Sequence, residues 1–123
     1  MKHIDQHSQE DRDSAINECS LMKYIDSPYV LGCEEIYDFE DQVWMFLQYM
    51  PGGELTKILK MVKNIDHELS EEFCKYTLFC VAKGVADLHA KNVLHRDIKS
   101  DNILFKVDGT IKIADLGFSV KLT

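Results

Sequence analysis

A group of residues able to do chemistry lies in the segment 95–102, whose sequence is HRDIKSDN. Asn102 closes this segment, and Asp115 follows thirteen residues later. Carboxylate and amide oxygens suit a hard cation such as Mg²⁺, which takes oxygen ligands and keeps some of its waters for exchange with phosphate. Asn102 and Asp115 are therefore candidate metal ligands.

Two further side chains of the segment suit phosphoryl transfer. Asp97 lies five residues before Asn102, where its carboxylate could accept a hydrogen bond from an incoming hydroxyl group. Lys99 supplies a positive charge for the phosphoryl group that is transferred. Together these four residues predict a site that joins a metal, a phosphate and a hydroxyl.

A long helix is predicted before the segment, from Ser70 to about Ala90. Ser70 is a good N-cap, and the acidic residues after it favour the positive end of the helix dipole. The helix carries an apolar stripe formed by Phe73, Tyr76, Cys80, Val85 and Leu88. The chemistry-bearing segment therefore follows the end of a helix.

A hairpin is predicted after the segment. The sequences ILFKV and TIKIA predict two short strands, and Asp108-Gly109 between them is a strong hairpin signal. Because a hairpin brings its two ends together, we expect Asn102 and Asp115 to converge on one point.

The segments HRDIKSDN and DLG resemble the catalytic and metal-binding loops of eukaryotic protein kinases. The resemblance implies that Asp97 orients the substrate hydroxyl and takes its proton, while Lys99 steadies the γ-phosphate of ATP. It also implies that Asn102 and Asp115 hold Mg²⁺. Lys99, two residues after Asp97, is similar to the lysine at this position in serine/threonine kinases. A charged surface loop without function would not place these residue types in this register.

Two positions bear on the resemblance. Leu116 stands between Asp115 and Gly117, where the family usually has phenylalanine. The metal-binding aspartate is unaffected, but the packing of residue 116 against the small-lobe helix becomes an open question. Arg96 resembles the arginine that pairs with a phosphorylated activation loop, and a solvent-facing arginine is the alternative.

Glu18 lies in SAINECSLM, which resembles the kinase helix whose glutamate pairs with the lysine of strand three. Lys2 precedes Glu18 by sixteen residues, a separation typical of the family, and is the candidate for that lysine. The alternatives are a generic exposed glutamate and a solvated terminal lysine.

The resemblance also implies which residues bind the nucleotide. Leu47 falls at the gatekeeper position, and the residues from Gln48 to Met50 form the hinge whose backbone would meet adenine. Glu54 is expected at the ribose hydroxyls, and Leu104 is the remaining residue of the nucleotide site. The segments MPGGEL, HRDIKSDN and DLGFSVKLT together most resemble the PAK-type branch of the STE group.

The first part of the chain reads as a helix and a hairpin. Residues 9–24 predict the helix, which ends at Ser27-Pro28 because a residue before proline avoids helical geometry. Residues 30–38 and 42–49 predict two antiparallel strands, and the second is apolar enough for an interior strand.

The expected fold is α+β, a truncated protein-kinase-like fold of two lobes. Pro51-Gly52-Gly53 breaks the chain between a strand-bearing half and a helical half, which begins with a short helix from Glu54 to about Lys63. Residues 1–50 would be the remnant of the small lobe. Residues 51–123 would hold the hinge exit, the long helix, the catalytic loop and the metal-binding loop.

The composition also bears on the expected partners, location and cysteine chemistry. A net charge of −7 argues against a nucleic-acid partner, because such binding relies on clustered Lys and Arg. The apolar stretches are too short and too interrupted to span a bilayer, and we expect a cytoplasmic or nuclear location. None of the four cysteines forms a CxxC pair, which favours reduced thiols over a disulfide or a zinc site.

The expected function is a protein serine/threonine kinase that uses ATP and Mg²⁺. A non-catalytic pseudokinase or truncated binding module is the main alternative, and a small-molecule phosphotransferase is another. The chain ends at Thr123 in mid-pattern, so we expect a piece that is inactive and poorly folded by itself. In such a piece the strand at 42–49 would lack a neighbour on one edge and invite aggregation.

Overall fold

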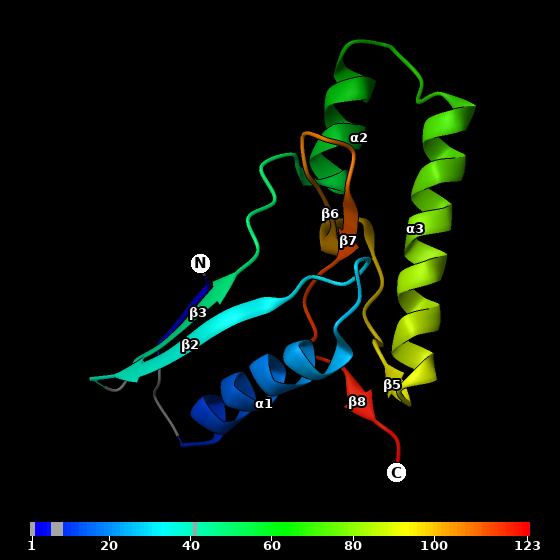
Figure 1. The fold of residues 1–123 in the computed structure, drawn as a ribbon. Coiled ribbons are helices and arrows are strands. Elements are labelled where there is room, and N and C mark those ends of the chain that lie inside the picture. Colours follow the sequence, from blue (N-terminus) through cyan, green and yellow to red (C-terminus); the bar gives the residue numbers. More distant parts are fainter. Residues whose placement is uncertain (1, 6–8, 41) are drawn as a thin grey trace.

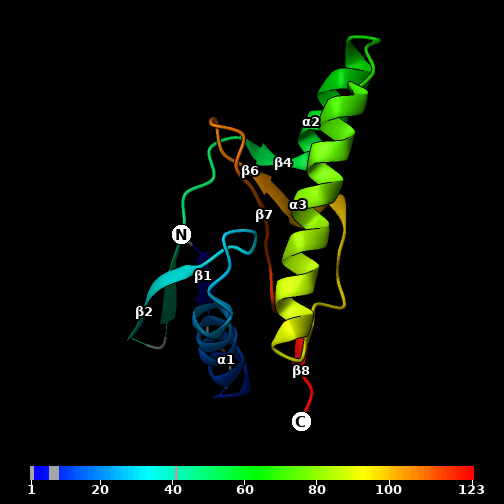
Figure 2. The same ribbon diagram turned by 45° about the vertical axis from the view of Figure 1, so that its right-hand side comes forward.

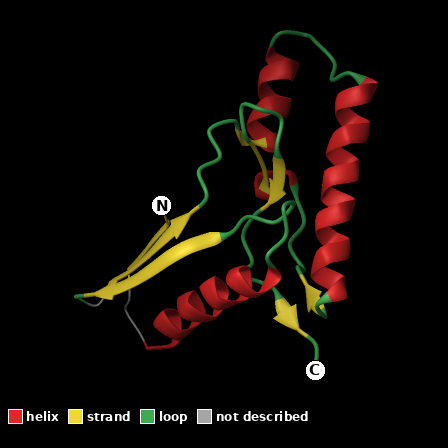
Figure 3. Cartoon of the chain, in the orientation of Figure 1, coloured by secondary structure: helices red, strands yellow, loops and turns green. Residues whose placement is uncertain are grey.

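The computed structural model describes residues 2–5, 9–40 and 42–123, the first of these ranges by its backbone only. The chain divides into a first half, where one helix lies beside a sheet, and a second half with two helices and small sheets (Figure 1). Figure 2 shows the same halves from another side, and Figure 3 shows that each half contains both helix and strand. This is the mixed α and β content that the sequence predicts.

The first half contains strand β1 (Lys2–Asp5), helix α1 (Gln9–Ile25) and strands β2 (Cys33–Phe39) and β3 (Gln42–Leu47). The sheet has the order β1-β3-β2 with antiparallel pairs, so β3 is its central strand. Helix α1 buries one face at a spacing of three to four residues, as an amphipathic helix does. The apolar members of this face are Ala15, Cys19, Met22 and Ile25.

The expectation that the strand at 42–49 lacks a neighbour on one edge is wrong. Strand β1 pairs with β3 on one side and β2 pairs with it on the other, with Lys2 opposite Met45. The side chains of Val43 and Met45 are fully buried in the core cluster that includes residues of α1. The backbone groups of β3 are thus satisfied along the stretch that β1 covers.

The predicted strand at 30–38 begins later than expected. Strand β2 starts at Cys33, and the residues before it bond to the second half of the chain instead. The N–H of Leu31 donates to the carbonyl of Ile113, and the N–H of Ile113 donates to the carbonyl of Tyr29, both at 2.8 Å. Val30 and Leu31 are buried at this junction, which explains their apolar character.

The connection between the halves runs through Pro51-Gly52-Gly53. The N–H of Gly52 donates to the carbonyl of Phe105 at 2.7 Å. A Cβ atom at position 52 would lie 2.6 Å from that carbonyl oxygen, a distance that real Cβ atoms do not reach. Glycine is therefore required here by a close approach of two backbones.

The second half holds strand β4 (Gly53–Glu54), helix α2 (Leu55–Asn64) and helix α3 (Glu71–Ala90). Ser70 caps α3 as predicted, because its side chain accepts a hydrogen bond from the N–H of Phe73 at 3.1 Å. Strand β5 (Val93–Leu94) follows α3 directly.

The last elements surround the segment 95–102. They are the 3-10 helix η1 (Ser100–Asn102) and strands β6 (Ile103–Phe105), β7 (Ile111–Ile113) and β8 (Val120–Lys121). Strands β4, β6 and β7 form one antiparallel sheet, whereas β5 pairs with β8. The predicted hairpin at Asp108-Gly109 is the β6–β7 turn.

Helix α3 buries a slightly different stripe from the predicted one. Its buried positions are Thr77, Cys80, Gly84 and Leu88. Tyr76, a member of the predicted apolar stripe, is half exposed. A Cβ atom at Gly84 would lie 2.7 Å from the side chain of Ile113, so α3 and β7 are in close contact there.

The expectation that all four cysteines are reduced is wrong for one pair. Cys19 and Cys33 form a disulfide between α1 and β2, with their Cα atoms 5.7 Å apart, while Cys74 and Cys80 are free thiols. The pair arises because the buried face of α1 packs against β2, a contact that sequence spacing does not reveal. Among the described residues no group of His, Cys, Asp and Glu is arranged to hold a metal ion, and no helix is long and apolar enough to cross a bilayer.

Candidate active site

The segment 95–102 is anchored on a buried histidine. His95 is almost completely buried, its Nδ1 accepts a hydrogen bond from the N–H of Asp97 at 3.1 Å, and its Nε2 lies 2.9 Å from the carbonyl oxygen of Ala114. Because Nδ1 is an acceptor, the ring is neutral and its proton lies on Nε2, which donates to Ala114. The histidine thereby joins the loop that carries Asp97 to the residue before Asp115.

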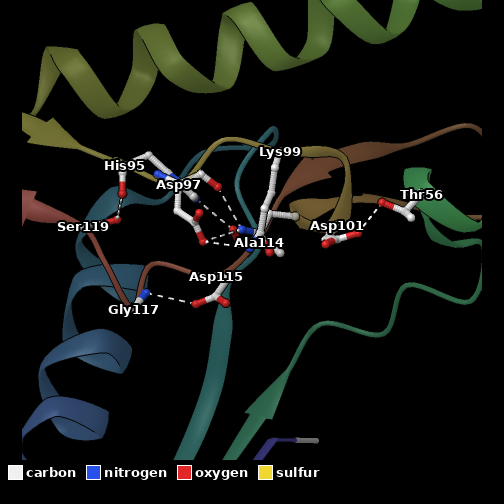
Figure 4. Close-up of polar contacts among 10 residues, drawn as sticks. Thr56, His95, Asp97, Lys99, Asp101, Ala114, Asp115, Gly117 and Ser119 are labelled. Carbon is white, nitrogen blue, oxygen red and sulfur yellow. Dashed lines mark hydrogen bonds and ion pairs between the residues drawn. The ribbon is translucent and has the colours of Figure 1, made fainter.

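Three of the predicted residues meet at one carboxylate (Figure 4). The side-chain amide of Asn102 donates to Oδ2 of Asp97 at 3.1 Å and to the carbonyl of Asp97 at 2.9 Å. Nζ of Lys99 lies 3.5 Å from the same Oδ2. Asn102 is buried, whereas the side chains of Asp97 and Lys99 are 23% and 53% exposed, so the two charged groups can meet a substrate.

Asp115 is brought to this group by the β6–β7 hairpin. Ile103 pairs with Ile113, and the N–H of Ala114 donates to the carbonyl of Asn102 at 2.8 Å. The predicted approach of Asn102 to Asp115 is therefore present in the fold. Figure 4 shows Asp115 beside the residues of the loop.

Asn102 and Asp115 each have a side-chain oxygen that could bind Mg²⁺. Because Asn102 uses its amide nitrogen toward Asp97, its side-chain oxygen remains for a ligand. Oδ1 of Asp115 accepts the N–H of Gly117 at 3.1 Å, and its Oδ2 accepts no hydrogen bond within the described ranges. One amide oxygen and one carboxylate oxygen are ligands of the kind that Mg²⁺ takes, with water and phosphate filling the other positions.

Two residues of this region have left-handed backbone conformations, Arg96 with φ 67° and Asp115 with φ 63°. Such conformations cost free energy for residues other than glycine, and they tend to gather at functional sites. Nε of Arg96 donates to the carbonyl of Phe118 at 2.7 Å, and Oγ of Ser119 donates to the carbonyl of His95 at 3.3 Å. These bonds hold the segment after Asp115 against the loop.

Glu18 and Leu116 meet beside the same segment. Leu116 is buried in the core cluster that also contains Ala15, Cys19 and Met22 of α1, so the unusual leucine packs on this helix. Glu18 is buried on α1, and its carboxylate lies 3.9 Å from the place of a Cβ atom at Gly117. Glu18 thus lies beside Gly117, two residues after Asp115.

The pairing of Glu18 with Lys2 stays a prediction. Lys2 belongs to strand β1, but its side chain lies outside the described part of the structure. Its backbone position next to Met45 of β3 places it in the same half of the chain as α1.

The residues predicted for a nucleotide line the junction of the halves. Leu47, Met50 and Leu104 are partly buried and pack against one core cluster. Leu104 lies opposite Glu54 in the β4–β6 pair. Within the described ranges, the carbonyl of Gln48 and the N–H of Met50 make no backbone hydrogen bond, which leaves one acceptor and one donor.

Sequence reasoning missed two sets of contacts. Thr56 on α2 lies 2.7 Å from the hydroxyl of Ser100 and donates to the carboxylate of Asp101, so α2 braces the loop. The side chain of Gln48 bonds to Lys112 of β7 at 2.9 Å. These partners lie more than forty residues apart in sequence, and no local pattern points to either contact.

Comparison with known proteins agrees with this geometry. The chain matches the family model described as protein kinase domain over residues 1–123. It is 37% identical to serine/threonine-protein kinase CLA4 of Candida albicans and 36% identical to CST20 of the same organism, over 100% and 99% of the chain. Over 100% of the chain it is 33% identical to serine/threonine-protein kinase PAK mbt of Drosophila melanogaster. The chain spans 12%, 10% and 18% of the length of these relatives.

Proposed function

The chain belongs to the family of protein kinase domains, and from this membership we propose that the protein transfers the γ-phosphate of ATP to serine or threonine hydroxyls of protein substrates. The observation that carries the proposal is the carboxylate of Asp97. It is oriented by Asn102 and Lys99 and lies next to the hairpin end that bears Asp115.

Asp97 has the geometry of a group that orients a hydroxyl. Its Oδ2 takes the bonds from Asn102 and Lys99, and its Oδ1 accepts no hydrogen bond within the described ranges. Oδ1 is the atom that would accept the hydroxyl proton of a serine or threonine. The hydroxyl oxygen then bonds to the γ-phosphorus, the bond from that phosphorus to the bridging oxygen breaks, and ADP leaves with the electron pair.

Lys99 and the two metal ligands would offset the negative charge of the phosphates. Lys99 is half exposed and shares its positive charge between Asp97 and a phosphate oxygen placed beside it. Asn102 and Asp115 are the residues that would hold Mg²⁺, which when bound neutralises charge on the β- and γ-phosphates. The protein kinase family uses ATP and Mg²⁺ in general, and the donor set here fits both.

The adenine end of ATP would lie at the other side of the junction. The free carbonyl of Gln48 and the free N–H of Met50 match the donor and acceptor edges of adenine. Leu47 and Leu104 would offer apolar contact, and Glu54, opposite Leu104 in the β4–β6 pair, would meet the ribose hydroxyls. Leu47 ends β3 and Glu54 ends β4, while Leu104 is the middle residue of β6.

The test is phosphoryl transfer from γ-labelled ATP to peptides that offer serine, threonine or tyrosine. We expect labelling of serine and threonine peptides by the protein and a loss of turnover by several powers of ten in Asp97→Asn, with little change in ATP affinity. Asp108→Asn is the matched control, because this exposed aspartate lies in the β6–β7 turn away from the loop. Full turnover in Asp97→Asn would refute the assigned roles, and ATP binding without any transfer would indicate a binding module.

A further inference from the structure

Lys112 is a buried lysine whose ammonium group meets an uncharged partner. The residue is 7% exposed at the middle of β7, and its Nζ donates to the side-chain oxygen of Gln48 at 2.9 Å. No carboxylate forms an ion pair with it within the described ranges. Buried lysines are uncommon unless they are paired, so this contact needs an explanation.

The same oxygen of Gln48 accepts a second hydrogen bond. The N–H of Gly32 donates to it at 3.0 Å, and the N–H of Gln48 donates to the carbonyl of Gly32 at 3.2 Å. Gly32 and Gln48 therefore face each other as a pair of antiparallel strands would. In such a pair the N–H of Gly32 would ordinarily bond to the backbone carbonyl of Gln48.

The side-chain oxygen of Gln48 accepts the hydrogen bond that the backbone carbonyl of Gln48 would ordinarily accept. Because the N–H of Gly32 is diverted to the Gln48 side chain, the backbone carbonyl of Gln48 accepts no backbone hydrogen bond within the described ranges. A Cβ atom at Gly32 would lie 3.3 Å from the side-chain carbon Cδ of Gln48, so the absence of a side chain at position 32 leaves room for the amide.

Lys112 fixes the orientation of this amide. Two donors, Lys112 and Gly32, converge on one oxygen, so the oxygen and not the nitrogen of the amide must face them. Lys112 also stands opposite Leu104 in the β6–β7 pair, and Leu104 stands opposite Glu54 in the β4–β6 pair. The bond between Lys112 and Gln48 therefore joins the connection between the halves to the hairpin that leads to Asp115.

We propose that Lys112 is a positioning residue for the nucleotide: it holds the side chain of Gln48 on Gly32 and so keeps the Gln48 carbonyl free to accept a hydrogen bond from the amino group of a purine. This inference rests on the proposed ATP-binding function. An amino purine such as adenine donates to that carbonyl, whereas the oxo group of guanine would face it as a second acceptor. Lys112 thereby contributes to the choice of ATP over GTP without touching either nucleotide.

The experiment measures the dissociation constants of ATP and GTP for the protein and five variants. Lys112→Met keeps an unbranched apolar stem but removes the donor, and Gln48→Leu removes the acceptor. Each is expected to weaken ATP binding about tenfold, the effect of one lost charge-assisted hydrogen bond, and to weaken GTP binding less. The double variant should lose no more ATP affinity than either single variant, because both changes break the same contact.

Two further variants guard against simple misfolding. Gln48→Glu keeps an acceptor for Lys112 and Gly32, and it should retain ATP affinity and the preference for ATP. Lys83→Met changes an exposed lysine of α3, which forms no part of the contact, and should leave both dissociation constants unchanged. If Lys112→Met does not fold, Gln48→Leu beside Gln48→Glu still decides the question.

The possible results separate this inference from the proposed function. Equal losses for ATP and GTP, or additive losses in the double variant, would overturn the role of Lys112 even in an active kinase. ATP binding without phosphoryl transfer would overturn the kinase function and leave the role of Lys112 open to the same affinity measurements. A protein that binds neither nucleotide would refute both.

Discussion

Helix α1 is held against its sheet by apolar side chains and by the Cys19–Cys33 disulfide, whereas the segment 95–102 is held by hydrogen bonds. Those bonds end largely on backbone atoms, such as the carbonyl groups of Ala114, Phe118 and His95. The helix presents a single carboxylate, Glu18, to the region of Asp115. The segment presents several polar groups within a few residues.

The difference shows how one small chain separates stability from chemistry. The hydrophobic effect is non-directional, so apolar packing can hold α1 on the sheet without orienting individual polar atoms. Hydrogen bonds are directional, and those of the segment fix Asp97 and Asn102 in orientation while leaving the carboxylate partly exposed. Changes in the first region should alter stability, and changes in the second should alter ligand binding and turnover.

The largest effect on ligand binding is expected for Asp115→Asn, which should weaken binding of Mg-ATP about a hundredfold through loss of a charged metal ligand. Asparagine tolerates the φ of 63°, so unfolding free energy should change little. Asp66→Asn is the matched control, because Asp66 has a similar φ of 54° and lies at the end of α2. Titration calorimetry with Mg-ATP checks binding, and unchanged affinity would remove Asp115 from the site.

Reduction of the disulfide should give the largest loss of stability. Cys19 and Cys33 are 14 residues apart, and a disulfide closing a loop of this length contributes about 3 kcal/mol to the free energy of unfolding. Urea unfolding with and without a reductant measures the difference. The double variant Cys19→Ala, Cys33→Ala should not respond to the reductant, and an equal response in both proteins would contradict the assignment.

Gly52→Ala tests the joint between the two regions. The added Cβ atom would collide with the carbonyl of Phe105, and we expect a loss of about 2–3 kcal/mol in the free energy of unfolding. Gly109→Ala is the comparison, because its Cβ atom would meet open space and only its φ of 90° opposes the change. A loss of about 1 kcal/mol is expected there. Equal losses at the two positions would show that the close approach at 52 has no energetic weight.

Ser70→Ala removes the N-cap of α3 and should cost about 1 kcal/mol of stability without altering nucleotide affinity. Ser20→Ala, at an exposed position of α1, should leave the unfolding free energy within about 0.5 kcal/mol of its original value. Thermal unfolding of the two variants gives the comparison. A larger loss at position 20 than at position 70 would contradict the cap.

The smallest effect is a dependence of stability on pH. Burial lowers the pKa of Lys112 in the folded protein below its ordinary value of 10.5, and the charge of Lys106 adds to the effect. The unfolded chain then binds more protons between the lowered pKa and 10.5, so this group makes the folded protein more stable as pH rises through that window. Lys112→Met should remove that gain, and an identical pH profile in both proteins would exclude it.

Local patterns were sufficient to predict much of the fold. Ser70, the acidic turn after it and the Asp108-Gly109 pair each act within a few residues, and the elements that they predict are present. The meeting of Asp97, Lys99 and Asn102 was also predictable, because they lie within six residues of one another.

The remaining features depend on which elements pack together, and sequence spacing carries no record of that. Residues 29–31 bond to Ile113 and not to β3, so the strand after α1 begins later than its apolar residues suggest. The disulfide follows from the contact of α1 with β2. The bond from Lys112 to Gln48 joins positions 64 residues apart, where a lysine in a strand would ordinarily be expected to face water.

The β6–β7 hairpin is bonded to the first half of the chain at Ile113, by residues 29–31, and at Lys112, by the side chain of Gln48. At Phe105 it is bonded to Gly52 in the connection between the halves. The same hairpin leads directly to Asp115. A displacement of the hairpin would therefore shift Asp115 and the contact with Gln48 together.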